Sequence, residues 1–134
     1  MGLVINYKLE TEGSFRGYTY NVGTFQGDYS QEEIDIIKLC GLSTLTSWLV
    51  GFVKIPEATC YRDLEKYNNI ICHGGTISYK GQVESQSGFW IGFYCNHLQD
   101  RANKKDEKFV ISECEMIIMQ LLDKDNFDNL YRIN

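Results

Sequence analysis

The chain is predicted to fold as an α+β domain in which an antiparallel sheet is packed by two main helices. Strand-like segments follow one another near the N-terminus with only short polar turns between them, and further strands occupy the middle of the chain. Two amphipathic segments, one in the first third and one in the last, carry helix start signals. No repeat or linker interrupts the 134 residues, a length that suits one domain.

Two strands and a helix are predicted in the first part of the chain. The strands cover residues 3–9 and 15–23, on either side of the turn residues Glu12–Ser14. A helix should then begin with the capping box Ser30–Glu33, in which the serine hydroxyl accepts from the glutamate N–H while the glutamate side chain reaches back. This helix is expected to end at Gly41.

Three strands are predicted in the middle of the chain. The first covers 47–55 and stops at Pro56, because proline has no backbone N–H to give to the ladder. The other two, 70–79 and 89–97, carry both histidines of the protein. Between them, the polar segment 80–88 is longer than a tight turn and is predicted to be a mobile loop beside a site.

A second helix should begin near Asp106, a good N-cap residue. Its apolar residues fall on one stripe, which predicts core packing: Val110, Cys114, Ile117, Ile118 and Leu121. The domain boundaries expected from the sequence are one domain over 1–134, with a hairpin and helix in 1–46, a signature region in 47–123 and an apolar tail in 124–134. The tail is expected to dock on its own domain or on another subunit, through Phe127, Leu130, Tyr131 and Ile133.

Composition limits the function classes. A formal net charge of -5 argues against a general nucleic-acid binder, although the segment 54–105 taken alone is net positive and would attract a small anion. No apolar run is long enough to cross a bilayer, and the first residues do not resemble a signal peptide. The five cysteines contain no CxxC pair, which is typical of scattered reduced thiols and favours the cytoplasm.

Metal binding and nucleophilic catalysis are both weakly supported. The two histidine-bearing strands carry four residues that could bind zinc: Cys72, His73, Cys95 and His97. However, adjacent residues of a strand point to opposite faces of the sheet, and the spacing matches no common zinc pattern. A Cys95–His97 nucleophile pair is also disfavoured, since a reactive thiolate needs an electropositive and partly open environment. No metal and no cofactor are therefore predicted.

The segment His73–Thr76 is better suited to ligand binding. Its two glycines allow close backbone approach, so that main-chain N–H groups can reach a phosphate or sugar, while Thr76 and His73 add side-chain hydrogen bonds. These four residues alone favour a glycine bulge in a strand. The neighbouring aromatic residues, Tyr79, Trp90 and Phe93, strengthen the binding hypothesis because a nucleobase needs an aromatic face on which to stack.

Five elements of the chain, in order, resemble a group of small phage and prophage proteins. The elements are Trp48–Pro56, Cys60–Tyr61, His73–Tyr79, Phe89–Asp100 and Glu113–Glu115. The relatives have a G-Y-V-x-V-P strand, a P-x-Y loop, an HGGxTY strand, a WxGFDxAHxxD strand and a V-x-x-E-C helix. In this chain Tyr94 replaces the relatives' acidic residue and Asn96 replaces their alanine.

The resemblance implies a counter-defence protein in the cytoplasm of an infected or lysogenic bacterial host. It suggests a non-catalytic homo-oligomer that sequesters a nucleotide-derived immune signal of the cyclic nucleotide or cyclic ADP-ribose type, such as those of Thoeris and CBASS, without binding nucleic acid polymers or membranes. Two alternatives stay open: a phosphodiesterase-like enzyme with His73 and His97 as acid and base, and a protein-binding inhibitor of a host defence enzyme.

The residues expected to bind the ligand follow from this interpretation. Trp90, Phe93 and Tyr79 would stack on the base. Gly74, Gly75 and Thr76 would take phosphate or ribose. Arg101 and Lys80 would neutralise the ligand's charge, and the set is completed by His73, His97 and Asp100.

Overall fold

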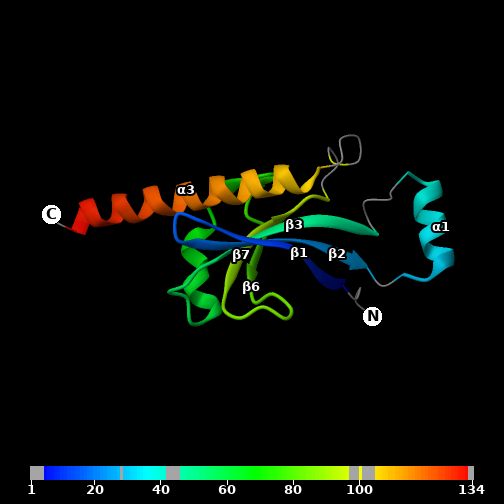
Figure 1. The fold of residues 1–134 in the computed structure, drawn as a ribbon, viewed down its shortest axis with the longest axis horizontal. Helices are drawn as coiled ribbons and strands as arrows, with labels where there is room; N and C mark the ends of the chain where they lie inside the picture. The colour runs from blue at the N-terminus through cyan, green and yellow to red at the C-terminus, as the bar shows by residue number, and fades with distance from the viewer. Residues whose placement is uncertain (1–4, 28, 42–45, 97–99, 101–104, 133–134) are drawn as a thin grey trace.

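A five-stranded antiparallel sheet forms the centre of the protein, and one long helix lies along one of its faces (Figure 1). The computed structural model describes residues 5–27, 29–41, 46–96, 100 and 105–132. The strand order is β1 (Ile5–Phe15), β2 (Tyr18–Gly27), β3 (Ser47–Lys54), β7 (Trp90–Tyr94) and β6 (Tyr79–Gly81). The predicted α+β class with an antiparallel sheet is confirmed.

The N-terminal hairpin is present, but its turn lies later than the sequence suggested. Phe15 pairs with Tyr18, so the turn consists of Arg16 and Gly17, and both have positive φ angles of 49° and 88°. A two-residue hairpin turn of this kind matches the right-handed twist of the strands. The expected turn at Glu12–Ser14 is therefore wrong, because these residues pair with β2 and continue the strand.

Helix α1 (Gln31–Leu39) has the predicted capping box, with the Glu33 N–H donating to Ser30 Oγ over 3.2 Å. It ends before Gly41, whose φ is 74°. None of its residues is buried, and Leu39 is 88% exposed. Of the two predicted helices, only the second packs on the sheet, while α1 lies at the far end of the molecule in Figure 1.

Two glycines allow close packing at the centre of the sheet. A Cβ on Gly92 of β7 would stand 2.1 Å from the carbonyl oxygen of Gly51 on the neighbouring strand β3. A Cβ on Gly51 would stand 2.8 Å from both the Phe93 ring and Val110 of the long helix. The strand predicted over 47–55 is confirmed and ends before Pro56.

The predicted single strand 70–79 is wrong. The chain instead makes a small hairpin from β4 (Ile71–Cys72) and β5 (Gly75–Thr76), and β6 starts at Tyr79. The hairpin reverses at His73 and Gly74, where Gly74 has a φ of 88° and Gly75 one of 121°. A 3₁₀ helix, η2 (Tyr61–Tyr67), precedes it and was not expected from the sequence.

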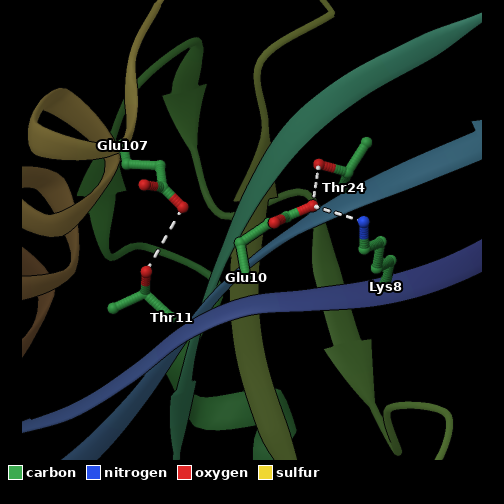
Figure 2. A network of polar contacts seen from close by, with 5 residues as sticks. All are labelled: Lys8, Glu10, Thr11, Thr24 and Glu107. Carbon is green, nitrogen blue, oxygen red and sulfur yellow. Dashed lines mark hydrogen bonds and ion pairs between the residues drawn. The ribbon is translucent and has the colours of Figure 1, made fainter.

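Helix α3 (Glu107–Arg132) confirms the second predicted helix. The Asp106 carboxylate accepts from the Phe109 N–H over 2.9 Å, and the predicted apolar stripe is buried against β2, β3 and β7. Figure 2 shows a further contact, in which Thr11 Oγ1 of β1 lies 3.2 Å from a Glu107 carboxylate oxygen. The side chains of the apolar tail lie outside those that the structure describes.

No helix in the described part of the chain combines the length and the apolar character needed to span a membrane.

Candidate functional site

The two faces of the sheet carry different apolar clusters. On one face, α3 packs against residues that include Val22, Val53, Ile91 and Phe93. The opposite face carries Val50, Phe52 and Trp90 in a cluster to which no α3 residue contributes, and Val83 from the 82–89 loop packs there instead. This second face is rich in aromatic side chains, with Tyr7, Phe25, Trp48, Tyr79 and Tyr94 packed around the cluster.

A pocket of about 360 Å³ opens on this second face, which we call the aromatic pocket. The residues that line it come from four strands and the loop after β6: Tyr7, Phe25, Tyr79, Gln82, Val83, Glu84 and Tyr94. Phe52 is fully buried beside them, with its ring centroid 5.6 Å from that of Tyr7 and 5.1 Å from that of Tyr79. The pocket walls are thus held by the core of the sheet.

Strand register brings these aromatic rings together. Tyr7 pairs directly with Phe25, and their ring centroids are 5.6 Å apart. Tyr94 lies one strand beyond β3, with its centroid 5.5 Å from Phe25 and 6.3 Å from Tyr79. The Tyr7 ring covers Gly23, where a Cβ would stand 2.3 Å from a ring carbon, so the glycine leaves the ring room to lie flat on the sheet.

The loop after β6 crosses the face of the sheet and completes the pocket. It leaves β6 at one edge of the sheet, yet the Glu84 carboxylate accepts a hydrogen bond from the Tyr7 N–H of β1, at the other edge, over 3.4 Å. The Tyr79 hydroxyl donates to the Gln82 carbonyl at the start of the loop. The predicted loop therefore borders a pocket, although most of the residues that line this pocket were not among those expected.

The aromatic pocket is weakly charged. Glu84 is the one charged residue among those described as lining it. Burial, with a smaller contribution from Tyr79, raises the pKa of Tyr94 to about 12, and burial also raises the pKa of Tyr79, so both phenols are neutral near pH 7. Figure 2 shows that the Lys8 ammonium contacts the Glu10 carboxylate, which accepts a hydrogen bond from the Thr24 hydroxyl. Because Thr24 lies on the α3 side of β2, the Lys8 side chain is turned away from the pocket.

Several buried polar atoms on this face have no hydrogen-bond partner in the part of the chain that the structure describes. They are the Tyr7 hydroxyl, the Trp48 Nε1 and both polar side-chain atoms of Asn21. Burial raises the pKa of Tyr7, and the Asn21 side chain beside it opposes this rise, so these two side chains are polar neighbours inside the face.

The three aromatic residues predicted to stack on one base do not lie together, and this prediction is corrected. Tyr79 lines the aromatic pocket. Trp90 is 2% exposed, belongs to the core of the same face, and donates its Nε1–H to the Ser87 carbonyl over 3.0 Å. Phe93 is fully buried on the α3 face, because neighbouring positions of a strand alternate between faces.

His73 and Asp100 form a buried pair outside the pocket. His73 Nε2 lies 2.9 Å from both carboxylate oxygens, with the two residues only 8% and 1% exposed. The imidazole also packs edge-on against Phe109 of α3, with ring centroids 5.1 Å apart. The two predicted ligand-binding residues thus lie within the packing between the β4–β5 hairpin and α3.

The remaining predicted residues are dispersed. Gly74, Gly75 and Thr76 are exposed in the small hairpin. The Lys80 ammonium donates to Asn68 Oδ1 and lies 5.7 Å from the Tyr61 ring centroid, beside η2. His97 and Arg101 lie outside the described residues.

Two cysteines weighed in the sequence analysis as metal ligands or nucleophile, Cys72 and Cys95, are buried. Desolvation raises the pKa of Cys72 and of Cys95 to about 12, so both thiols are protonated near pH 7. No group of three or more histidine, cysteine or acidic side chains in the described ranges is arranged to hold a metal ion.

Six of the seven lining residues were missed by sequence reasoning, which found only Tyr79. The missed residues are Tyr7, Phe25, Gln82, Val83, Glu84 and Tyr94. One signal was available: in β7, Tyr94 shares a face with Trp90 and not with Phe93, by simple alternation. The lining residues from β1 and from the loop after β6 could not be found in this way, because they reach the pocket through contacts between distant parts of the chain.

The chain was compared with protein-family models, with curated proteins and with solved structures, and none of them matches it.

Proposed function

We propose that the protein is a non-catalytic binding protein that sequesters a nucleotide-derived signalling molecule in the aromatic pocket. The observation that supports this most is the convergence of Tyr7, Phe25, Tyr79 and Tyr94 around one cavity on the face opposite α3. In a bacterial host cytoplasm, such binding would serve the counter-defence role that the resemblance to phage proteins implies.

The size of the pocket fits part of a nucleotide. Its volume of about 360 Å³ lies at the lower end of the range of about 300–1,000 Å³ for small-molecule sites. This is enough for a ring system and part of a sugar, while the rest of the ligand would stay outside. Contact of a base with an aromatic side chain contributes about 1–3 kcal/mol per base, so one or two ring contacts would give a substantial share of the affinity.

Charge determines which part of the ligand enters. Two like charges about 4 Å apart repel by about 4 kcal/mol near a protein surface, so the Glu84 carboxylate disfavours a phosphate inside the pocket. The phosphate would remain in solvent or contact residues beyond the rim. This revises the sequence-based roles, in which Gly74, Gly75 and Thr76 took the phosphate close to the stacked base.

Binding is favoured over catalysis by the chemistry of the lining. Acid–base hydrolysis needs two groups whose pKa values lie near the working pH. The described lining offers phenols that burial keeps protonated and one solvent-exposed carboxylate. His73, the acid or base of the alternative enzyme hypothesis, is buried against Asp100 outside the pocket.

The test is calorimetric titration of the full chain with a panel of cyclic and linear nucleotides, using Tyr94→Leu as the pocket variant. The matched control is Tyr61→Leu, which removes an exposed tyrosine outside the pocket. We expect Tyr94→Leu to weaken binding about tenfold or more, since one stacking contact is lost, and Tyr61→Leu to leave it unchanged. Heat-denatured complex should release intact nucleotide at no more than one molecule per site, and equal binding by both variants, or removal of ligand far beyond the protein concentration, contradicts the proposal.

A further inference from the structure

We infer that the group bound by the aromatic pocket is an N-alkylated cation, such as an N-alkylated pyridinium ring or base or a quaternary ammonium group. This inference rests on the proposed function, because it specifies the ligand chemistry of the same pocket. It is carried by the mutual orientation of the rings and by the position of one carboxylate.

The lining rings are not parallel to one another. Interplanar angles between neighbouring rings are 88° for Tyr7 and Phe25, 43° for Phe25 and Tyr94, and 61° for Tyr79 and Tyr94. A neutral flat base gains most between two nearly parallel rings. Rings set at an angle to one another leave no parallel-walled slot for a flat base, whereas a cation is attracted to the face of a single ring.

Electrostatics favours a positive group at the same place. The Glu84 carboxylate is held at the pocket by the Tyr7 N–H. Because it is solvent-exposed, it can pair with a ligand cation without prior desolvation. The phenols of Tyr79 and Tyr94 add no competing negative charge, because burial raises both pKa values.

Alkylation follows from the hydrogen bonds that the pocket offers. A primary ammonium carries three N–H donors that need acceptors when water is removed. Four of the seven described lining residues are aromatic, and a ring face accepts an N–H donor only weakly. An N-alkylated cation has no N–H donors at its charged centre, and its alkyl groups can contact the ring faces directly.

The experiment compares cations with neutral molecules of the same shape on the full-length protein. One pair is choline and its neutral carbon analogue dimethylbutanol, and the other is the N-methylpyridinium form of nicotinamide and nicotinamide itself. We expect each cation to bind about tenfold or more tightly than its neutral partner, as several ring faces and a carboxylate act together. Glu84→Gln should weaken binding of the cations by about twofold to fivefold and should change binding of the neutral probes less.

Two variants separate the ring face from the hydroxyl. Tyr94→Phe keeps the π-face and should retain cation binding, whereas Tyr94→Leu should lose it, and thermal unfolding of each variant shows whether the fold is intact. Equal affinity for cations and neutral analogues, or no binding of any cation, overturns the inference. Neutral nucleosides that bind with no preference for a cation would leave the proposed function standing, whereas choline binding without any nucleotide binding would overturn only the nucleotide proposal.

Discussion

The Nε2 atom of His73 lies 2.9 Å from both carboxylate oxygens of Asp100, in a pair that is almost wholly buried. The pair connects the turn of the β4–β5 hairpin to the segment before α3, and Phe109 of α3 covers the imidazole. Both residues were predicted from the sequence to bind a ligand, but in the structure they pack against each other and against α3.

Removing Asp100 should therefore destabilise the fold. Loss of one member of a buried, hydrogen-bonded pair costs about 3–5 kcal/mol, so Asp100→Ala should lower the urea midpoint strongly. Glu65→Ala, at an exposed carboxylate, serves as the control and should have little effect. The double variant with His73→Ala should cost less than the two single changes together, and additive costs would show that the residues do not act as a pair.

Gly92→Ala should also be strongly destabilising. The new Cβ would stand 2.1 Å from the Gly51 carbonyl oxygen, and this backbone atom is fixed by the β3–β7 ladder. The expected loss of folding stability is larger than the cost of ordinary overpacking, which is about 1–3 kcal/mol. Gly17→Asn, in a turn where a Cβ meets nothing within 4 Å, should cost much less in the same unfolding experiment. Similar stabilities for the two variants would contradict this packing.

Trp90→Ala tests a residue that the sequence suggested as a stacking platform. Since Trp90 is 2% exposed in the core of the sheet, its truncation should cost about 3–5 kcal/mol of stability, measured by denaturant unfolding. Trp90→Phe, which retains most of the buried ring, should recover part of this loss. A stable Trp90→Ala protein that fails only in ligand binding would restore the stacking role.

The cysteines should divide into two reactivity classes. Cys40 and Cys60 are exposed, whereas Cys72, Cys95 and Cys114 are buried. A thiol reagent at neutral pH should therefore modify Cys40 and Cys60 quickly and the other three only after denaturation, as followed by mass spectrometry. Rapid modification of all five in folded protein would contradict the burial.

The same buried thiols predict a loss of stability in alkali. Desolvation raises the pKa of Cys95 to about 12, above the ordinary thiol value of about 9. The folded state then holds this proton more tightly than the unfolded state does, so the stabilisation is complete below pH about 9 and is lost as the pH rises toward about 12. The unfolding midpoint in denaturant should fall across this range, and less so in Cys95→Ala.

The expected homo-oligomer stays a prediction. Helix α1 has no buried residue, and its Ile36 and Leu39 are 56% and 88% exposed. Light scattering after size exclusion should give a mass that is a multiple of 15.5 kDa. If α1 takes part in the contact, Leu39→Glu should shift the mass toward the monomer, while a monomeric parent protein would refute the prediction.

Local patterns in the sequence determined several elements because short-range physics fixes them. The Ser30–Glu33 capping box, the Asp106 N-cap and the apolar stripe of α3 depend on residues three or four positions apart. The strand over 47–54 followed from its apolar run and from Pro56. These features were predicted correctly.

Tertiary structure alone decided which face each aromatic residue occupies and which distant residues meet. The turn at Arg16–Gly17 and the irregularity between Leu9 and Thr11 set the register of β1 against β2, and a strand shifted by one residue turns every side chain to the opposite face. Phe93 and Tyr94 are neighbours in sequence, yet one packs under α3 and the other lines the aromatic pocket. The contact between Glu84 and Tyr7 joins the loop after β6 to β1, because the loop crosses the sheet, and no local pattern encodes such a long-range meeting.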